Sequence, residues 1–193
     1  MTAAGKVTIG FSKPYVALYS ESGGTVTYSS GQLLARGVSV SAEPSSSDNN
    51  NFYADNLVAE TDAGSFTGGT VTLTVDGLLQ DAEKLIQGLP AVDADGFLNY
   101  DDDQATPYVG IGFIIKFMSE GVAYYTPVIF PKSRAGQLNI AAETQGESIS
   151  WQTGEITFNI FKDDTAKHQW KKVGGELATE TAAENAIKTF LGI

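Results

Sequence analysis

Val109-Gly110-Ile111-Gly112-Phe113-Ile114-Ile115-Lys116-Phe117-Met118 is the stretch that decides the fold. Apolar side chains at every second position are typical of a β-strand with one face in a hydrophobic core. The other row of this strand begins with two glycines, which would let a bulky ring or another backbone approach closely, or would mark a bend in a curved sheet. The apolar row consists of Val109, Ile111, Phe113, Ile115 and Phe117.

Alternation with a period of two continues outward from this strand and predicts a mainly β protein. Residues 38–42 and 71–75 alternate in the same way, and Ser119-Glu120-Gly121 predicts a tight turn into a strand over residues 122–130. The pairs Gly23-Gly24 and Gly68-Gly69 predict further hairpin turns. We expect a β-sandwich or half-open barrel.

Two segments have helical spacing instead. The first covers about residues 77–88, with Asp76 as the expected N-cap and Gly88 as the stop signal. The second covers about residues 181–191, where Thr181 and Glu184 have the spacing of a capping box. Each is predicted to be a short helix that flanks the sheet.

Composition narrows the classes of function. The 193 residues, 42% of them hydrophobic, are enough for one domain over 1–193 with a real core. The chain contains no cysteine, which excludes disulfides and thiolate chemistry. A net charge of −11 argues against binding to nucleic acid through phosphate contacts. No apolar run is long enough to cross a bilayer, so no membrane partner is expected.

A polar run at residues 43–51 leads into the aromatic stretch 52–56. Its side chains can satisfy backbone groups locally and bury almost nothing, so we expect a long extended loop that stays mobile until another molecule covers it. This makes it a candidate assembly element between subunits. The candidate residues are Pro44, Ser45, Ser46, Ser47, Asp48, Asn49, Asn50 and Asn51.

The search for chemistry gives no catalytic residues, cofactor or metal, and the protein is not expected to be an enzyme. The acidic loop Asp93–Asp103 suggests calcium, but with Gly96 at the sixth position the twelfth is Asp102 instead of a glutamate. His168 is the only histidine, and no Gly-x-Ser-x-Gly or phosphate-binding loop is present. The basic run around Trp170 is interpreted as a solvated strand or turn.

Eight tyrosines leave open an alternative, a carbohydrate-binding sandwich such as an adhesin or a lectin-like surface domain. Tyrosine is also common in hydrophobic cores and at interfaces between protein surfaces. The residues are Tyr15, Tyr19, Tyr28, Tyr53, Tyr100, Tyr108, Tyr124 and Tyr125.

Several segments, in order along nearly the whole chain, resemble the major tail proteins of long, non-contractile-tailed (siphovirus-type) bacteriophages. They are Lys13–Tyr19, Leu34–Ser41, Asn50–Asn56, Glu143–Thr153, and Trp170 followed by an alanine-rich helix. The stretch Asp93–Thr106 is the least similar. The motif residues within these segments are Phe52, Tyr53, Ala54, Asp55, Asn56, Trp151, Gln152 and Thr153.

The resemblance implies a structural virion protein, the tail tube subunit. Such subunits self-assemble into stacked hexameric rings that form a hollow conduit for genome delivery. With this resemblance, Pro44–Asn51 become the candidate inter-ring assembly loop. The implied partners are other copies of the chain and the tape-measure, tail-terminator and tail-tip proteins, while DNA passes through the lumen without specific binding. The implied locations are the virion tail and, during assembly, the host cytoplasm.

Overall fold

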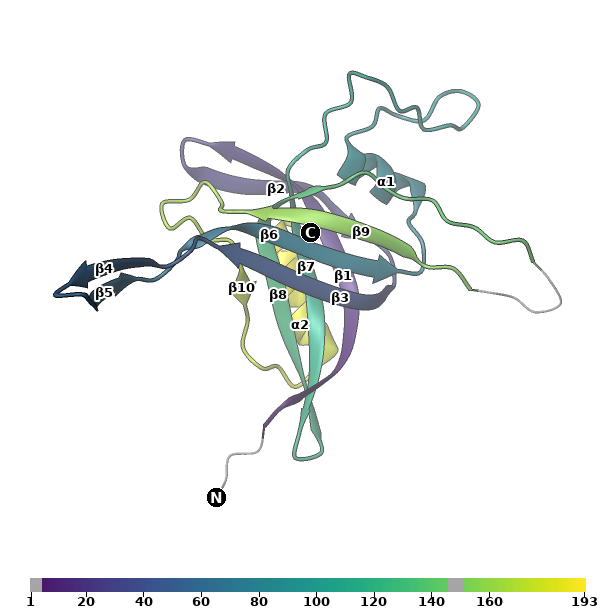
Figure 1. Cartoon of the computed structure of the whole chain (residues 1–193). Helices are drawn as coiled ribbons and strands as arrows, with labels where there is room; N and C mark the ends of the chain where they lie inside the picture. The colour runs from purple at the N-terminus through teal and green to yellow at the C-terminus, as the bar shows by residue number, and fades with distance from the viewer. Residues whose placement is uncertain (1–4, 146–150) are drawn as a thin grey trace.

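A computed structural model of the chain describes residues 5–145 and 151–193, in which one large antiparallel sheet is accompanied by two helices and a separate hairpin (Figure 1). The strand order is β2-β1-β7-β8-β9-β6-β3, and β10 pairs with β8 outside this path. The mainly β class with two short helices is therefore confirmed. The strands of the sheet are β1 Val7–Ser22, β2 Thr25–Leu33, β3 Gly37–Ser46, β6 Phe66–Val75, β7 Val109–Ser119, β8 Val122–Ala135, β9 Gly154–Phe161 and β10 Lys172–Val173.

The sheet curls until its two halves face each other. Figure 1 shows β3, β6 and β9 in front of β1, β7 and β8. The Phe11 side chain of β1 lies directly against Gly37 at the start of β3, although β3 pairs with β6 alone in the described chain. The result is a half-open barrel, as predicted, with a seam between β1 and β3.

Strand β7 separates two hydrophobic layers. Its odd-numbered row, which includes Ile111 and Phe113, packs inside the barrel with Phe130 of β8 and Phe158 of β9. Of its even-numbered row, Gly110, Gly112 and Ile114 face the helix α2, Glu180–Leu191. A Cβ added at Gly110 would lie 2.5 Å from the ring of Tyr28. The predicted close approach at the glycine row is confirmed.

Helix α2 is present, but its predicted cap is wrong. The N-cap is Thr179, whose hydroxyl accepts a hydrogen bond from the Ala182 amide at 3.2 Å, so Thr181 lies inside the helix. Glu184 does not reach back to the helix start, because its carboxylate binds Lys13, Tyr15 and Lys188. The predicted helix itself, including its end before Gly192, is confirmed.

Helix α1, Gln80–Gln87, starts later than predicted. Its N-cap is Leu79, with no side-chain cap, and Asp76 instead accepts hydrogen bonds from the backbone amide and guanidinium of Arg36. The expected Asp76 cap is therefore wrong, since a tertiary ion pair holds that carboxylate. Gly88 ends the helix in the left-handed conformation, as predicted.

The three turn predictions in the sheet had different outcomes. Gly23 and Gly24, with φ values of 59° and 79°, form the predicted turn between β1 and β2. Glu120 and Gly121 have φ values of 50° and 80°, so the predicted β7–β8 turn is confirmed. The Gly68-Gly69 turn is wrong, because these residues lie within β6 opposite Ser45 and Pro44. Gly69 is required there by close approach, since a Cβ would meet the backbone of Pro44 at 2.7 Å.

Candidate assembly surface

The polar run expected to be a loop is mostly strand. Pro44, Ser45 and Ser46 complete β3, while Asn50 and Asn51 begin β4, Asn50–Ala54. Strand β4 pairs with β5, Leu57–Asp62, to form a two-stranded hairpin that projects from the body (Figure 1). Only Ser47, Asp48 and Asn49 connect β3 to it. We call residues 47–65 the arm.

The polar residues at the base of the arm hold its two chain segments to each other. The Ser47 amide donates to the Ser65 carbonyl at 2.9 Å, and the Ser65 amide donates to the Ser47 hydroxyl at 3.0 Å. The Asn49 side-chain oxygen accepts from the Gly64 amide at 3.0 Å. These side chains do satisfy backbone groups locally, as expected, but in doing so they order the segment.

The arm carries an unusual amount of exposed apolar surface. Exposed fractions are 65% for Phe52, 62% for Tyr53, 72% for Leu57 and 49% for Val58. An isolated two-stranded hairpin is only marginally stable in water, and clustered exposed apolar side chains mark interaction sites. The arm therefore has the composition of a segment that another surface covers.

The charge on the arm has a single sign. Its charged residues at neutral pH are Asp48, Asp55, Glu60 and Asp62, with no lysine or arginine. Such a segment favours a basic receiving surface, because complementary charge steers association and selects the partner.

The second set of motif residues lies in another part of the molecule. Trp151 is 85% exposed, and Gln152 and Thr153 line a depression of about 390 Å³ beside α1. Figure 1 shows the chain that precedes β9 on the opposite side of the body from the arm. The structure thus does not bring together the motif residues 52–56 and 151–153. Residues 146–150 of the similar segment 143–153 lie outside the described residues.

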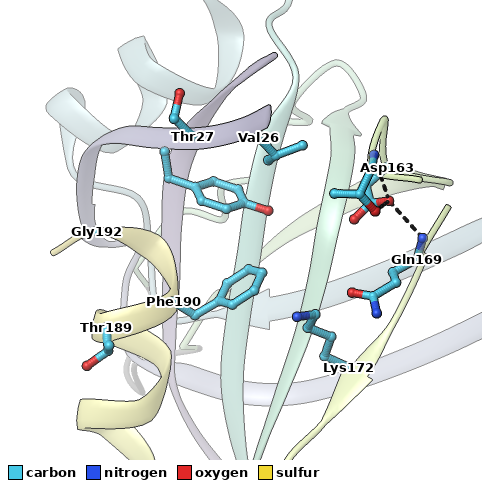
Figure 2. Close-up of a pocket in the computed structure, with 10 residues that line it drawn as sticks. Val26, Thr27, Asp163, Gln169, Lys172, Thr189, Phe190 and Gly192 are labelled. Carbon is cyan, nitrogen blue, oxygen red and sulfur yellow. Dashed lines mark hydrogen bonds between the residues drawn. The ribbon is translucent and has the colours of Figure 1, made fainter. Parts of the chain in front are cut away.

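A depression of about 420 Å³ lies between the end of α2, β2 and the turn before β10 (Figure 2). Its wall is built on the buried Asp163, whose carboxylate accepts from the Gln169 amide and the Thr165 hydroxyl at 2.7 Å each. The Lys172 ammonium lies 4.7 Å from the centre of the Phe190 ring. The Gln169 side chain also lines the depression, so a ring, a side-chain amide and an ammonium are available to a small polar ligand.

The basic run around Trp170 was expected to be a solvated strand or turn, and its internal hydrogen bonds and ring stacking were not predicted. Asp163 organises the backbone, and Trp170 stacks on Phe66 with ring centres 4.3 Å apart and 4° between the planes. The predicted turn is confirmed, but it is tied to the core. The Asp-x-Thr spacing at residues 163–165 was the available signal, because such side chains often bond to their own following backbone.

The acidic loop uses its key carboxylate internally. Asp93 accepts hydrogen bonds from the amides of Asp95 and Phe97 and from the side chain of Asn99. The bond from Phe97, followed by that from Asn99, holds the pKa of Asp93 below its usual value. In the described part of the chain, no group of three or more His, Cys, Asp or Glu residues is placed to hold a metal ion.

The tyrosines do not gather on one face. Tyr15 is buried, Tyr19 packs edge-on against both Tyr28 and Tyr108, and Tyr53 is exposed on the arm. Tyr100 lies on the segment after α1 and donates to Glu83 at 2.6 Å.

No helix within residues 5–145 and 151–193 is long and apolar enough to cross a membrane. Comparison with models of known protein families finds none that matches this chain, and comparison with curated proteins finds no match either.

Proposed function

We propose that this chain is a structural virion protein, the tail tube subunit of a long, non-contractile-tailed bacteriophage. It self-assembles into stacked hexameric rings around a hollow conduit for the genome. Its partners are other copies of itself and the tape-measure, tail-terminator and tail-tip proteins. It acts in the virion tail after assembly in the host cytoplasm, and it is not an enzyme.

The observation that carries this proposal is the projecting arm. Other large apolar side chains are exposed on the body, but the arm gathers four of them on one projecting hairpin that has no core of its own, which is costly for a monomer and useful for a polymer. The ordered resemblance of the chain to tail tube proteins supports the same conclusion. The net charge of −11 fits a conduit, since a negative wall repels passing DNA.

The test compares two double variants of the full chain. Phe52→Ser with Tyr53→Ser removes the aromatic residues of the arm, and Val92→Ser with Phe97→Ser is the control on an exposed segment elsewhere. Electron microscopy and sedimentation follow assembly as concentration rises, and urea unfolding measures monomer stability. We expect the arm variant to keep its monomer stability and to need at least ~30-fold more protein for assembly, from ~2 kcal/mol lost per interface.

Native-length tubes from the arm variant at the wild-type concentration would remove the arm from assembly. A wild-type chain that stays monomeric at every concentration would count against the tube proposal as a whole.

A carbohydrate-binding module remains the second candidate because of the ring, amide and ammonium around the depression in Figure 2. For that candidate we expect saturable glycan binding by a stable monomer.

A further inference from the structure

The open seam of the half-open barrel contains an apolar groove of about 520 Å³. Strands β1, β3, β7, β8 and β10 all contribute to it. Its apolar lining includes Phe11, Val38, Val40, Ile115, Phe117 and Val128.

A polar group inside the groove has no partner. Thr126 lines the groove and is 3% exposed, yet its hydroxyl forms no hydrogen bond. A buried unsatisfied hydroxyl costs about 1–3 kcal/mol, so it points to a ligand that supplies the missing bond.

The groove also lies between two free strand edges. In the chain that the structure describes, residues 7–12 of β1 pair only with β7, and β3 pairs only with β6. Unpaired edges offer backbone donors and acceptors to another strand. A β-structured ligand therefore suits this groove better than a compact small molecule.

The charges on the groove are basic. Lys171 lines it, and its ammonium lies 5.9 Å from the centre of the Phe130 ring. Lys6 also lines it and pairs with Glu176 at 2.9 Å on the exposed surface. The arm, with apolar residues and four acidic groups, is the complementary segment of this same chain.

The arm cannot fill the groove of its own subunit. Val38 lies at the groove and Ser46 at the arm end of the same strand, which places them roughly 26 Å apart at the usual rise per residue. Figure 1 shows the arm directed away from the body at that far end. Any arm in the groove must come from another copy.

We propose that the seam groove is the acceptor site for the arm of a second copy. Apolar side chains of the arm enter the groove, its acidic residues approach Lys171, and its backbone or polar groups bond Thr126. This inference rests on the proposed self-assembly and adds the receiving surface, which that function leaves unspecified.

The test uses the absence of native cysteine, because every disulfide then comes from an engineered pair. Chains with Ala54→Cys on the arm are mixed with chains carrying Val38→Cys at the groove, under mild oxidation. The matched control carries Val92→Cys, another exposed valine on the segment after α1. We expect the groove pair to form mixed disulfide dimers at least ~10-fold faster than the control pair, since bridging needs the two Cα atoms within about 7 Å.

Equal rates for the two pairs, or a faster control pair, would overturn the inference. Electron microscopy of the same unoxidised mixtures separates this result from the proposed function. If tubes form but the groove pair does not cross-link, the groove is not the acceptor site, while the tail tube proposal stands. If the groove pair cross-links fast in discrete dimers that never form rings, the acceptor site is supported and the tail tube proposal is refuted. A further variant, Lys171→Glu, should slow the groove cross-link, and an unchanged rate would contradict the charge argument.

Discussion

Replacing Glu184 by glutamine should destabilise the folded chain in a way that depends on pH. Glu184 lies on α2 and ties this helix to Lys13 and Tyr15 of β1, next to a second bond from Ser12 of β1 to Glu180. The Tyr15 hydroxyl donates to it at 2.6 Å, the Lys188 ammonium lies at 2.8 Å, and Lys13 binds its other oxygen. Its side chain is only 13% exposed.

The size of the effect follows from the pKa of this carboxyl group. The bond from Lys13 first, then those from Lys188 and Tyr15, lower the pKa of Glu184 from 4.5 to about 2. A shift of this size corresponds to roughly 3 kcal/mol. Since Lys13 and Lys188 are about one-third exposed, solvent screening reduces the expectation to about 1–2 kcal/mol.

The direction with pH is fixed by the sign of the shift. A carboxyl group whose pKa is lower in the folded chain stabilises that chain most when both states are ionised, above about pH 5. This contribution is lost as pH falls from about 4.5 toward 2, the interval between the two pKa values. Wild type and Glu184→Gln should therefore differ by about 1–2 kcal/mol at pH 7 and converge near pH 2.

Urea unfolding of the monomer at several pH values between 2 and 7 measures this difference. Glu176→Gln is the matched control, because it makes the same chemical change in an exposed pair with Lys6 and should cost less than about 0.5 kcal/mol. Equal stability of Glu184→Gln and wild type at pH 7 would refute the reasoning, as would a difference that persists undiminished at pH 2.

Two further changes test the packing and the seam. Gly112→Ala places a Cβ 2.7 Å from the buried Ile187 side chain, so it should lower the free energy of unfolding by about 1–3 kcal/mol. Urea unfolding measures this loss, and no loss would mean that α2 moves freely on the sheet. Thr126→Val removes the unpartnered hydroxyl, so it should raise monomer stability by about 1 kcal/mol in the same assay. The same variant should slow the cross-link between arm and groove. Lower monomer stability would show that the hydroxyl already has a partner.

The parts of the fold that were predictable depend on local periodicity. The alternation around Val109–Phe117 and the glycines in its second row were sufficient to place a strand that another ring approaches closely. Both helices were found, and both of their starts were misplaced. Asp76 and Glu184 are good capping residues by type, but each is held by a cation distant in the sequence, Arg36 or Lys13, which short-range rules do not include.

The sequence indicated the arm as a candidate assembly element but predicted the wrong structure for it. Serine and asparagine suggested a mobile loop, yet the hairpin signal was present in Asp55-Asn56, where both residues have positive φ between apolar flanks. Asparagine and aspartate tolerate this conformation better than most residues, so the pair makes a two-residue turn. The weak strand propensity of Asn50 and Asn51 concealed it.

The groove was beyond sequence reasoning because it belongs to the seam and not to any one segment. Its walls come from β1 and β3, whose approach depends on how far the sheet curls, and its unpaired Thr126 looks like an ordinary strand residue in the sequence.

Arm and groove together explain how one chain can be both soluble and ready to assemble. The arm exposes apolar residues that would invite aggregation, but it carries four acidic groups on a chain of net charge −11, so like-charged copies repel each other at long range. At ordinary salt that repulsion is largely screened beyond about 10 Å. At shorter range the arm meets the lysines of the seam instead of the average surface. Acidic charge then suppresses unspecific contacts, while the basic rim of the groove favours one specific contact. Added salt should weaken both effects at once, so assembly through this contact depends on ionic strength less than the net charge alone suggests.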